Sequence, residues 1–303
     1  MNEKQSPRVS VVVTCYNYGN FIDTCLNSIL NQTFTDHEII IVNDGSTDDS
    51  EEKILPYAQK HENITYIKQK NAGQARAKNV GIRNSSGEYV AFLDADDIWE
   101  EEKLERQLPI FEDKAVGVAY SKAKYINEQG KLMDFELTGR YLQPRKGWVT
   151  DYLIYDNFVP FSSAIVRREC LDDFRGFDES YAMGIDWDLW LRISTKFKFD
   201  YVDERLLNYR IGHGTQMSKE KEKRHFYSEQ ILNNFLKKYK INKKLYKRVN
   251  TYTYENRGYY YATSNTMLSI KYYIKAMKTN PFSYNVYKGL ARVIFIKMNL
   301  RSA

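Results

Sequence analysis

The segment Tyr89-Val90-Ala91-Phe92-Leu93-Asp94-Ala95-Asp96-Asp97 passes from apolar residues to acids within a few positions. Its first five residues are β-formers or apolar, which predicts a buried strand that ends in three carboxylates. Carboxylates this close repel one another unless a cation lies between them. Asp94 and Asp96 therefore predict a hard divalent metal with oxygen ligands. The alternative is a solvated turn in which Asp97 is the N-cap of a helix that begins at Ile98.

Strands and helices alternate upstream of this segment, with short connections between them. Such alternation predicts a parallel sheet with helices on both faces, in which ligands bind beyond the carboxyl ends of the strands. The strand ends at 14–17, 43–46 and 94–96 are all polar, and we expect them to lie on one edge of the sheet. The predicted strands are 8–14, 38–42, 64–67 and 88–93, and the predicted helices are 21–30, 75–83 and a segment between Ser50 and His61.

Both common glycine-rich phosphate loops are missing from the sequence. No Gly-x-Gly-x-x-Gly follows the first strand, and no Gly-x-x-x-x-Gly-Lys-Ser/Thr occurs anywhere. The sequence therefore lacks the loops with which dinucleotide-binding and P-loop proteins bind phosphates, and both interpretations are disfavoured. A nucleotide site without such a loop must neutralise phosphates with a metal and with cationic side chains. Asp94 and Asp96 can supply the first, and Arg76 and Lys78 the second.

Charge is distributed unevenly along the chain. The 303 residues have a formal net charge of +6, but residues 219–303 contain 19 Lys and Arg against four acids. We expect an α/β domain over residues 1–218 and a basic, helical, tyrosine-rich region over 219–303. Such a region suits an anionic membrane surface, and a helical cap packed on the first domain is an equal alternative. Nucleic acid is not an expected partner, because residues 1–218 are acidic.

The cysteines and the hydropathy pattern indicate the compartment. Cys15, Cys25 and Cys170 lack the paired spacing of a disulfide framework or a zinc site, so we expect them to be core residues in a reducing environment. Residues 1–8 are polar, and no stretch reaches the eighteen or so uncharged apolar residues of a spanning helix. We expect a cytoplasmic protein, and a peripheral position on the inner face of the cell membrane is compatible with its basic region.

Five motifs follow one another over about the first 215 residues. They are VSVVVTCYN at 9–17, IIVNDGSTD at 40–48, NAGQARAKNVG at 71–81, FLDADD at 92–97, and GFDE at 176–179 followed by DWDLWLR at 186–192. Together they resemble the family 2 glycosyltransferases of bacteria, which are inverting, nucleotide-sugar-dependent enzymes of the GT-A fold. The resemblance implies that fold, an α/β sheet with helices on both faces, and a nucleotide diphosphate sugar as donor, a UDP-sugar being the commonest case.

The resemblance also implies a donor site at the strand ends. A divalent ion, Mn²⁺ or Mg²⁺, would be bound by Asp96 and Asp94 and completed by His213, in a loop whose flanking glycines favour mobility. The alternative for His213 is an ordinary surface residue. The implied nucleotide-sugar residues are Thr14, Tyr16 and Asn17 at the nucleoside, Asp44 at the base, Lys78 at the diphosphate, Asp94 at the ribose, and Ala95 and Asp96 beside it.

Asp186 matches the acid that serves as general base in this family. A sugar hydroxyl is a poor nucleophile at neutral pH, so its attack on an anomeric carbon needs a carboxylate within reach of its proton. The alternative for Asp186 is the N-cap of a core helix over 187–193. One residue departs from the family, because Ile185 stands where an acid usually precedes the base.

The resemblance and the residues that match it together imply a metal-dependent inverting glycosyltransferase that acts on a glycan or lipid-linked acceptor in cell-surface polysaccharide synthesis. The acceptor residues we expect are Trp148, Asn157 and Trp187. The alternative, motivated by Ile185, is a catalytically impaired module that binds a nucleotide sugar or a glycan.

Overall fold

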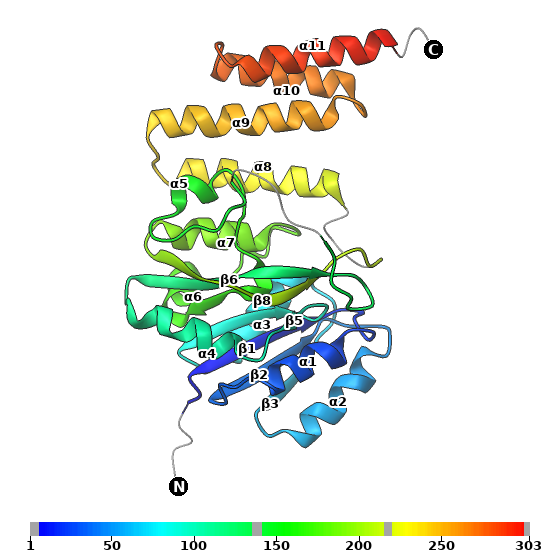
Figure 1. Ribbon diagram of the computed structural model, residues 1–303, viewed down its shortest axis with the longest axis vertical. Coiled ribbons are helices and arrows are strands. Elements are labelled where there is room, and N and C mark those ends of the chain that lie inside the picture. Colours follow the sequence, from blue (N-terminus) through cyan, green and yellow to red (C-terminus); the bar gives the residue numbers. More distant parts are fainter. Residues whose placement is uncertain (1–5, 135–140, 215–219, 300–303) are drawn as a thin grey trace. The chain divides into compact units, whose positions relative to one another are not determined.

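The computed structural model describes residues 6–134, 141–214 and 220–299. The chain divides into two compact units, residues 1–228 and 229–303. The boundary expected at residue 218 lies outside the described residues. A mixed sheet with flanking helices forms the first unit, and the described part of the second unit is helical (Figure 1).

One eight-stranded sheet forms the centre of the first unit, in the order β3-β2-β1-β4-β7-β6-β8-β5. The four strands predicted from the sequence form its parallel half. Thr14 pairs with both Val42 and Asp94, so the polar strand ends meet on one edge of the sheet, as predicted. In the other half, β7 is antiparallel to its neighbours β4 and β6, and β8 is parallel to β6 but antiparallel to β5. The strands are β1 Val9–Cys15, β2 His37–Asn43, β3 Ile64–Lys68, β4 Tyr89–Asp94, β5 Ile98–Trp99, β6 Val116–Ile126, β7 Ile165–Arg167 and β8 Lys198–Arg210.

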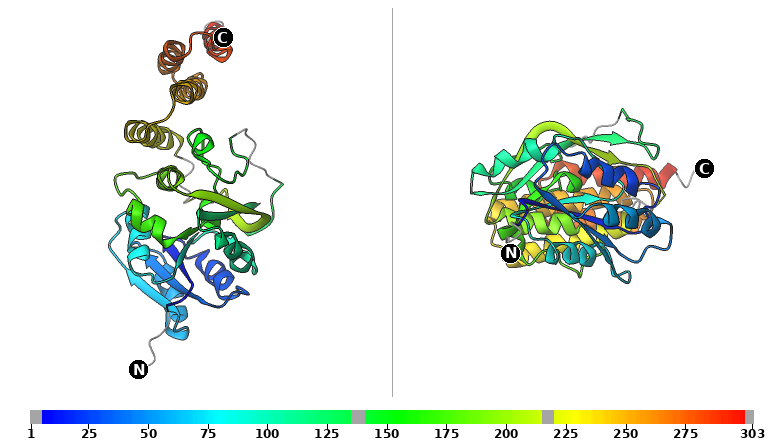
Figure 2. Two further views of the ribbon diagram at one scale, coloured as in Figure 1. Left: turned by 90° about the vertical axis from the view of Figure 1, so that its left-hand side faces the viewer. Right: turned by 90° about the horizontal axis from the view of Figure 1, so that it is seen from below.

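Helices cover both faces of this sheet (Figure 2). Alternate residues of a strand point to opposite faces. Val11 and Val13 of β1 belong to the same core cluster as Leu26 of α1, whereas a Cβ on Gly81 of α3 would lie 2.3 Å from Val12 Cγ1. The two helices therefore pack on opposite faces of β1, and Gly81 permits the close approach of α3. The helical segments of this unit are α1 Ile22–Leu30, α2 Ser50–Lys60, α3 Gln74–Arg83, α4 Lys103–Gln107, α5 Thr150–Leu153, α6 Arg168–Phe174, α7 Ile185–Ser194 and the 3-10 turns η1 Leu108–Glu112 and η2 Phe161–Ser163.

Two alternatives left open by the sequence are wrong. Ile98 and Trp99 form the short strand β5, so Asp97 does not cap a helix there. Helix α7 begins at Ile185 after Gly184, whose φ of +72° suits glycine, so Asp186 lies in the first turn and not at the cap. The three cysteines are free and buried, which confirms their expected core position.

The second unit contains most of α8 and three further helices. Tyr273 of α10 packs closely against the two neighbouring helices. A Cβ added to Gly258 would lie 2.8 Å from the nearest ring atom of Tyr273, and one added to Gly289 would lie 2.2 Å from it. Two of the helices begin with Asn caps that accept from a backbone N–H of the first turn, Asn242 from Leu245 and Asn265 from Leu268. The helices are α8 Lys221–Lys238, α9 Lys243–Tyr261, α10 Thr266–Thr279 and α11 Tyr284–Asn299.

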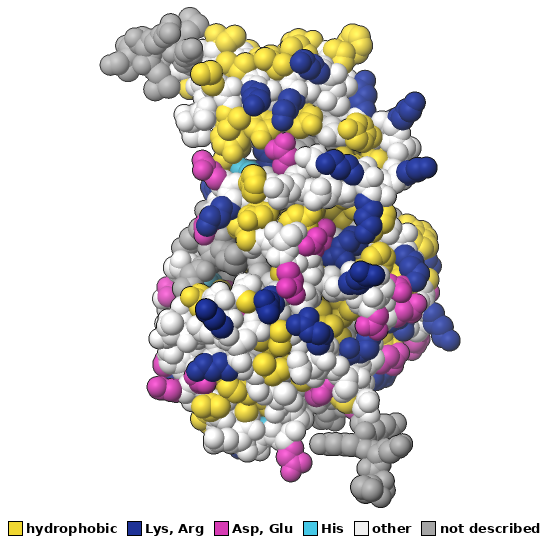
Figure 3. Space-filling view, turned by 180° about the vertical axis from the view of Figure 1, so that it is seen from behind, with side chains coloured by type: hydrophobic (Ala, Val, Ile, Leu, Met, Phe, Trp, Pro, Cys, Tyr) yellow, Lys and Arg dark blue, Asp and Glu magenta, His cyan; other side chains and the backbone are white. Residues whose placement is uncertain are grey.

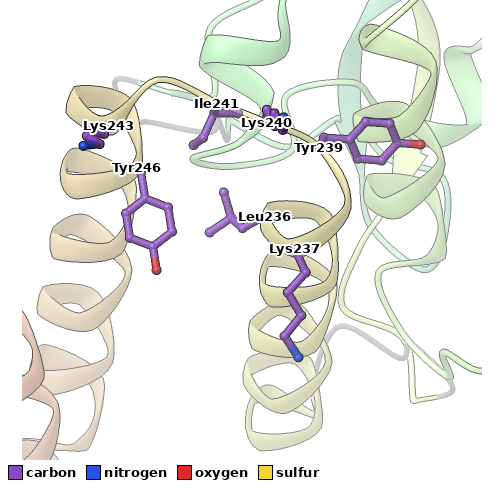
Figure 4. A pocket seen from close by; sticks show the side chains of 7 residues that line it. All are labelled: Leu236, Lys237, Tyr239, Lys240, Ile241, Lys243 and Tyr246. Atoms are coloured by element: carbon purple, nitrogen blue, oxygen red, sulfur yellow. The ribbon is translucent and has the colours of Figure 1, made fainter.

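A hollow of about 390 Å³ lies at the connection between α8 and α9 (Figure 4). Three lysines and two tyrosines are among its lining residues, which makes it basic. Its lining consists of Leu236, Lys237, Tyr239, Lys240, Ile241, Lys243 and Tyr246. Across the described ranges of the chain, every helix is too short or too polar to cross a membrane.

Candidate active site

Asp94, at the end of β4, forms an ion pair with Lys78 of α3. Lys78 Nζ donates to Asp94 Oδ1 at 2.7 Å and to Thr14 Oγ1 at 3.2 Å, and it lies 4.6 Å from the centre of the Phe161 ring. Lys78 is buried. Burial raises the pKa of Asp94, and the ammonium group of Lys78 opposes this rise. Lys78 thus lies at the strand ends, where the diphosphate is expected, with its charge balanced by Asp94.

Asp96 lies against His213, which follows β8. Asp96 Oδ2 is 2.9 Å from His213 Nε2, and the imidazole is buried beside the rings of Phe21 and Tyr18. A carboxylate oxygen and an imidazole nitrogen are ligands that suit Mn²⁺ better than Mg²⁺. In the parts of the chain that the structure describes, no group of three or more His, Cys, Asp or Glu is placed to hold a metal. Two protein ligands fit an ion that takes its other ligands from a diphosphate and water.

Asp97, the third acid, is buried and fixes the position of the other two. Its carboxylate accepts hydrogen bonds from Ser162 Oγ at 2.5 Å and from the backbone N–H of Arg210 at 2.8 Å. Arg210 Nε donates to the carbonyl of Asp96, also at 2.8 Å. Ala95, between Asp94 and Asp96 in the sequence, is buried in the core. Asp97 therefore ties the acid turn to the end of β8, from which the chain continues to His213.

Asp186 lies in the first turn of α7. Burial raises its pKa, the Asp94 carboxylate adds to the rise, and the ammonium of Lys78 opposes it. Both charges act on the ionisation of Asp186, so they lie near its carboxyl group. A carboxylate with a raised pKa is a better proton acceptor near neutral pH than an ordinary one.

Asn157 holds the Asp186 carboxylate. Its Nδ2 donates to Asp186 Oδ2 at 2.7 Å, while its own Oδ1 accepts from the N–H of Val159 at 3.1 Å. The backbone N–H of Asn157 donates to Asp156 Oδ1 at 2.9 Å. These contacts fix the amide so that an N–H points at the carboxylate. The structure thus places Asn157, expected at the acceptor, directly against the expected base.

The other expected acceptor residues occupy different environments. Trp148 is exposed over 60% of its surface. Trp187 is buried, and its indole N–H donates to the carbonyl of Leu153 at 2.6 Å, which joins α7 to α5. Ile185 is also buried, so the position where the family has an acid contributes an apolar side chain to the core.

Asp44, at the end of β2, is surrounded by donors from the segment that leads into α3. Its Oδ1 accepts from Gln69 Nε2 at 2.6 Å and from the N–H of Ala72 at 2.9 Å, and its Oδ2 accepts from the N–H of Gly73 at 2.9 Å. A carboxylate has about four acceptor positions, so one remains for a base.

Asn17 joins the ends of β1 and β2. Its backbone has a left-handed φ of +59°, its N–H donates to Ser46 Oγ at 3.0 Å, and its Oδ1 accepts from the N–H of Thr47 at 2.8 Å. Asn tolerates this conformation better than most residues. Beside it, Tyr16, which is expected at the nucleoside, is exposed over 44% of its surface.

Asn79 connects α3 to the loop that precedes α7. Its Nδ2 donates to the carbonyl of Phe177 and to Glu179 Oε1, and its Oδ1 accepts from the N–H of Phe177, each at 2.9 Å. A Cβ on Gly176 would lie 2.6 Å from the same Oδ1. Adjacent residues of α3 therefore hold two parts of the candidate site: Lys78 holds the acid turn, and Asn79 holds the loop before the expected base. Neither Asn79 nor the Ser162–Asp97–Arg210 contacts are predictable from spacing alone, since the partners come from distant segments.

The protein family and the relatives that match this chain are glycosyltransferases or polysaccharide synthases. The model of "Glycosyl transferase family 2" matches residues 10–174. A glycosyltransferase of Rickettsia felis, described as uncharacterized, is 33% identical over 208 residues, covering 69% of this chain and 34% of that protein. A chondroitin synthase of Escherichia coli is 31% identical over 244 residues, covering 78% of this chain and 34% of that protein. The chain thus spans about a third of the length of these relatives.

Solved structures share the fold over nearly the whole chain. TarS 1–349 of S. aureus in complex with UDP-GlcNAc has a TM-score of 0.73 at 16% identity, covering 97% of this chain and 92% of that one. The mannosyltransferase PcManGT of Pyrobaculum calidifontis, in complex with GDP-Man and Mn²⁺, has a TM-score of 0.63 at 18% identity, covering 97% and 81%.

Proposed function

The chain belongs to glycosyl transferase family 2, and on this premise we propose that it moves a sugar, with inversion, from a nucleotide diphosphate donor to a hydroxyl group. The GT-A fold expected from the sequence is confirmed by the similarity to TarS. One observation carries the proposal: Lys78 of α3 pairs with Asp94, and the next residue, Asn79, bonds to the loop that leads to Asp186. One helix therefore holds both a candidate donor residue and the loop that precedes the candidate base.

The proposed reaction is a single displacement. Asp186 accepts the proton of the acceptor hydroxyl as its oxygen forms a bond to the anomeric carbon, and the bond from that carbon to the diphosphate oxygen breaks. The electron pair of the broken bond stays on the leaving diphosphate. Asn157 orients the Asp186 carboxylate, and Lys78 supplies positive charge near the leaving group when a donor displaces it from Asp94.

A divalent ion fits this site. Asp96 and His213 would hold it, and Asp94 would join them only by leaving Lys78. The ion, when bound, would neutralise charge on the leaving diphosphate. The Mn²⁺ in the PcManGT structure supports a divalent metal in proteins of this fold.

UDP is the proposed nucleotide, because Asp44 keeps an acceptor position for the N–H of a uracil. The UDP-GlcNAc complex of TarS supports this choice, and the GDP-Man complex of PcManGT is the main competitor. A panel of UDP- and GDP-sugars, assayed for nucleotide release with Mn²⁺ and with EDTA, tests donor and metal together. Release from no donor, combined with tight UDP binding, would favour the alternative function, a nucleotide-sugar binding module, which the buried Ile185 motivates.

The proposed function also includes an acceptor and a position in the cell. We propose a growing surface glycan or a lipid-linked glycan as acceptor, near Trp148 and Asn157. A position on the inner face of the cell membrane would suit such an acceptor, and the basic residues of the second unit support an anionic surface as partner.

A further inference from the structure

An aromatic side chain projects from the turn between α10 and α11. Phe282 is 91% exposed and Tyr284, two residues later, is 74% exposed. Single exposed apolar side chains are common, but a contiguous group of them marks a contact surface. Phe282 is therefore a candidate contact residue.

The turn that carries Phe282 is held in place by its neighbours. The hydroxyl of Tyr287 donates to the carbonyl of Pro281 at 2.6 Å, and Ser283 Oγ donates to Glu255 of α9. The N–H of Ser283 donates to the carbonyl of Asn280 at 3.2 Å. These bonds anchor the backbone on both sides of Phe282, so its exposure does not depend on a free loop.

Helix α11 continues the exposed aromatic surface. Its inner face packs Val286 and Val293 into the core of the unit. On the opposite face, exposed apolar residues recur with the three- and four-residue spacing of a helix. A helix face in water is usually polar, so this apolar face is unusual. We call it, together with Phe282, the outer face of α11: Phe282, Tyr284, Tyr287, Ile294 and Phe295, each more than half exposed.

Charge in the second unit is almost entirely positive. Residues 229–303 contain 15 Lys and Arg against two acids. Both acids have partners inside the unit: Glu229 accepts from the hydroxyl of Tyr272 at 2.9 Å, and Glu255 accepts from Ser283. Exposed Lys278 and Lys288 lie on either side of the turn. Figure 3 shows basic and hydrophobic side chains interleaved over one face of the C-terminal helices.

We propose that the outer face of α11 docks on an anionic lipid surface, with Phe282 and the tyrosines among the headgroups and Lys278 and Lys288 against lipid phosphates. Aromatic side chains and basic residues in this combination suit a membrane interface. A symmetric contact with a second copy is disfavoured, because it would bring Lys288 and its neighbours against like charges. The inference extends the proposed function, which names an anionic surface but not the residues that meet it.

The test is co-sedimentation of the full chain with two kinds of vesicle, phosphatidylcholine alone and phosphatidylcholine with about one third phosphatidylserine. We expect binding to the second kind only, weakening with salt. Phe282→Ser and Phe295→Ser should each weaken it about tenfold, and Lys278→Gln or Lys288→Gln about fivefold. Phe226→Ser is the matched control, because Phe226 is 57% exposed but lies in the first unit. It should bind like the parent.

Three results would overturn the proposal. These are equal binding to neutral vesicles, parent-like binding by both outer-face Phe variants, and no binding of the parent to either kind of vesicle. If such a parent forms dimers that are lost in Phe295→Ser, the face belongs to a contact with a second copy. Thermal melting checks that each variant is folded. UDP titration of the same proteins distinguishes a failure of the proposed transferase function from a failure of the proposed lipid contact. Loss of UDP binding would count against the proposed transferase and leave the vesicle result standing.

Discussion

The side-chain amide of Asn157 donates a 2.7 Å hydrogen bond to Oδ2 of Asp186, so the candidate base is oriented by a residue from another segment. A hydrogen bond to the charged form of a carboxylate favours that form. Asn157→Ala should therefore raise the already raised pKa of Asp186 further. A base works only when deprotonated, so activity falls as pH falls through this pKa, and the variant should lose activity at a higher pH than the parent. The measurement is the pH–rate profile of sugar transfer, with exposed Asn84→Ala as control. An unshifted acid limb would remove Asn157 from this role.

A second prediction concerns Asp44. If it accepts a hydrogen bond from the base, Asp44→Ala should weaken UDP binding by about 1 to 3 kcal/mol. The substitution also frees three donors of the segment before α3, so the thermal midpoint should fall as well. Calorimetry with UDP measures the first effect, and thermal melting measures the second. A lower midpoint with unchanged UDP affinity would make Asp44 a purely structural residue.

The metal site gives the third prediction. Asp96→Ala and His213→Ala should each weaken UDP binding in Mn²⁺, because the diphosphate loses the charge of a bound ion. In EDTA the variants and the parent should bind UDP alike. Parent-like UDP affinity of Asp96→Ala in Mn²⁺ would contradict the metal assignment.

The fourth prediction concerns Asn79, which holds the loop before α7. Asn79→Ala should leave UDP affinity near that of the parent and lower the rate of transfer, because the loop positions Asp186 and not the nucleotide. Asn79→Asp would place a carboxylate against Glu179, and the second change Glu179→Gln should partly restore the rate.

Asn84→Ala, near the end of the same helix, is again the control. Equal losses of UDP affinity and rate in Asn79→Ala would indicate a general disturbance of α3 in place of a positioning role.

The sequence predicts the parallel half of the sheet well, because apolar runs with polar ends are strong local signals. Thr14, Asn43 and Asp94 meet at one edge because parallel strands bring their carboxyl ends together. The antiparallel half is less predictable, since β5 has two residues and β7 has three, too few for a periodic pattern.

The candidate site is predictable only in part. Motifs identify Asp94, Asp96 and Asp186, but not what each side chain contacts. Asn157 and Asp186 are 29 residues apart, and Asp97 and Arg210 are 113 apart, so tertiary folding alone brings them together. Charge composition marks the second unit as basic, but only the fold shows that both of its acids are engaged internally.

The central claim is that Asp186 is the general base, and Asp186→Asn tests it most directly. The amide keeps the size of the side chain and can still accept from Asn157, and Gly184 rather than Asp186 caps α7, so fold and UDP affinity should be preserved. It cannot accept the acceptor's proton, so transfer from the preferred donor should fall about 10²- to 10⁴-fold, or roughly 3 to 5 kcal/mol of barrier. The measurement is the transfer rate of this variant beside its UDP affinity. A large loss of rate at unchanged affinity is the predicted result, and transfer at the parent rate would contradict the account.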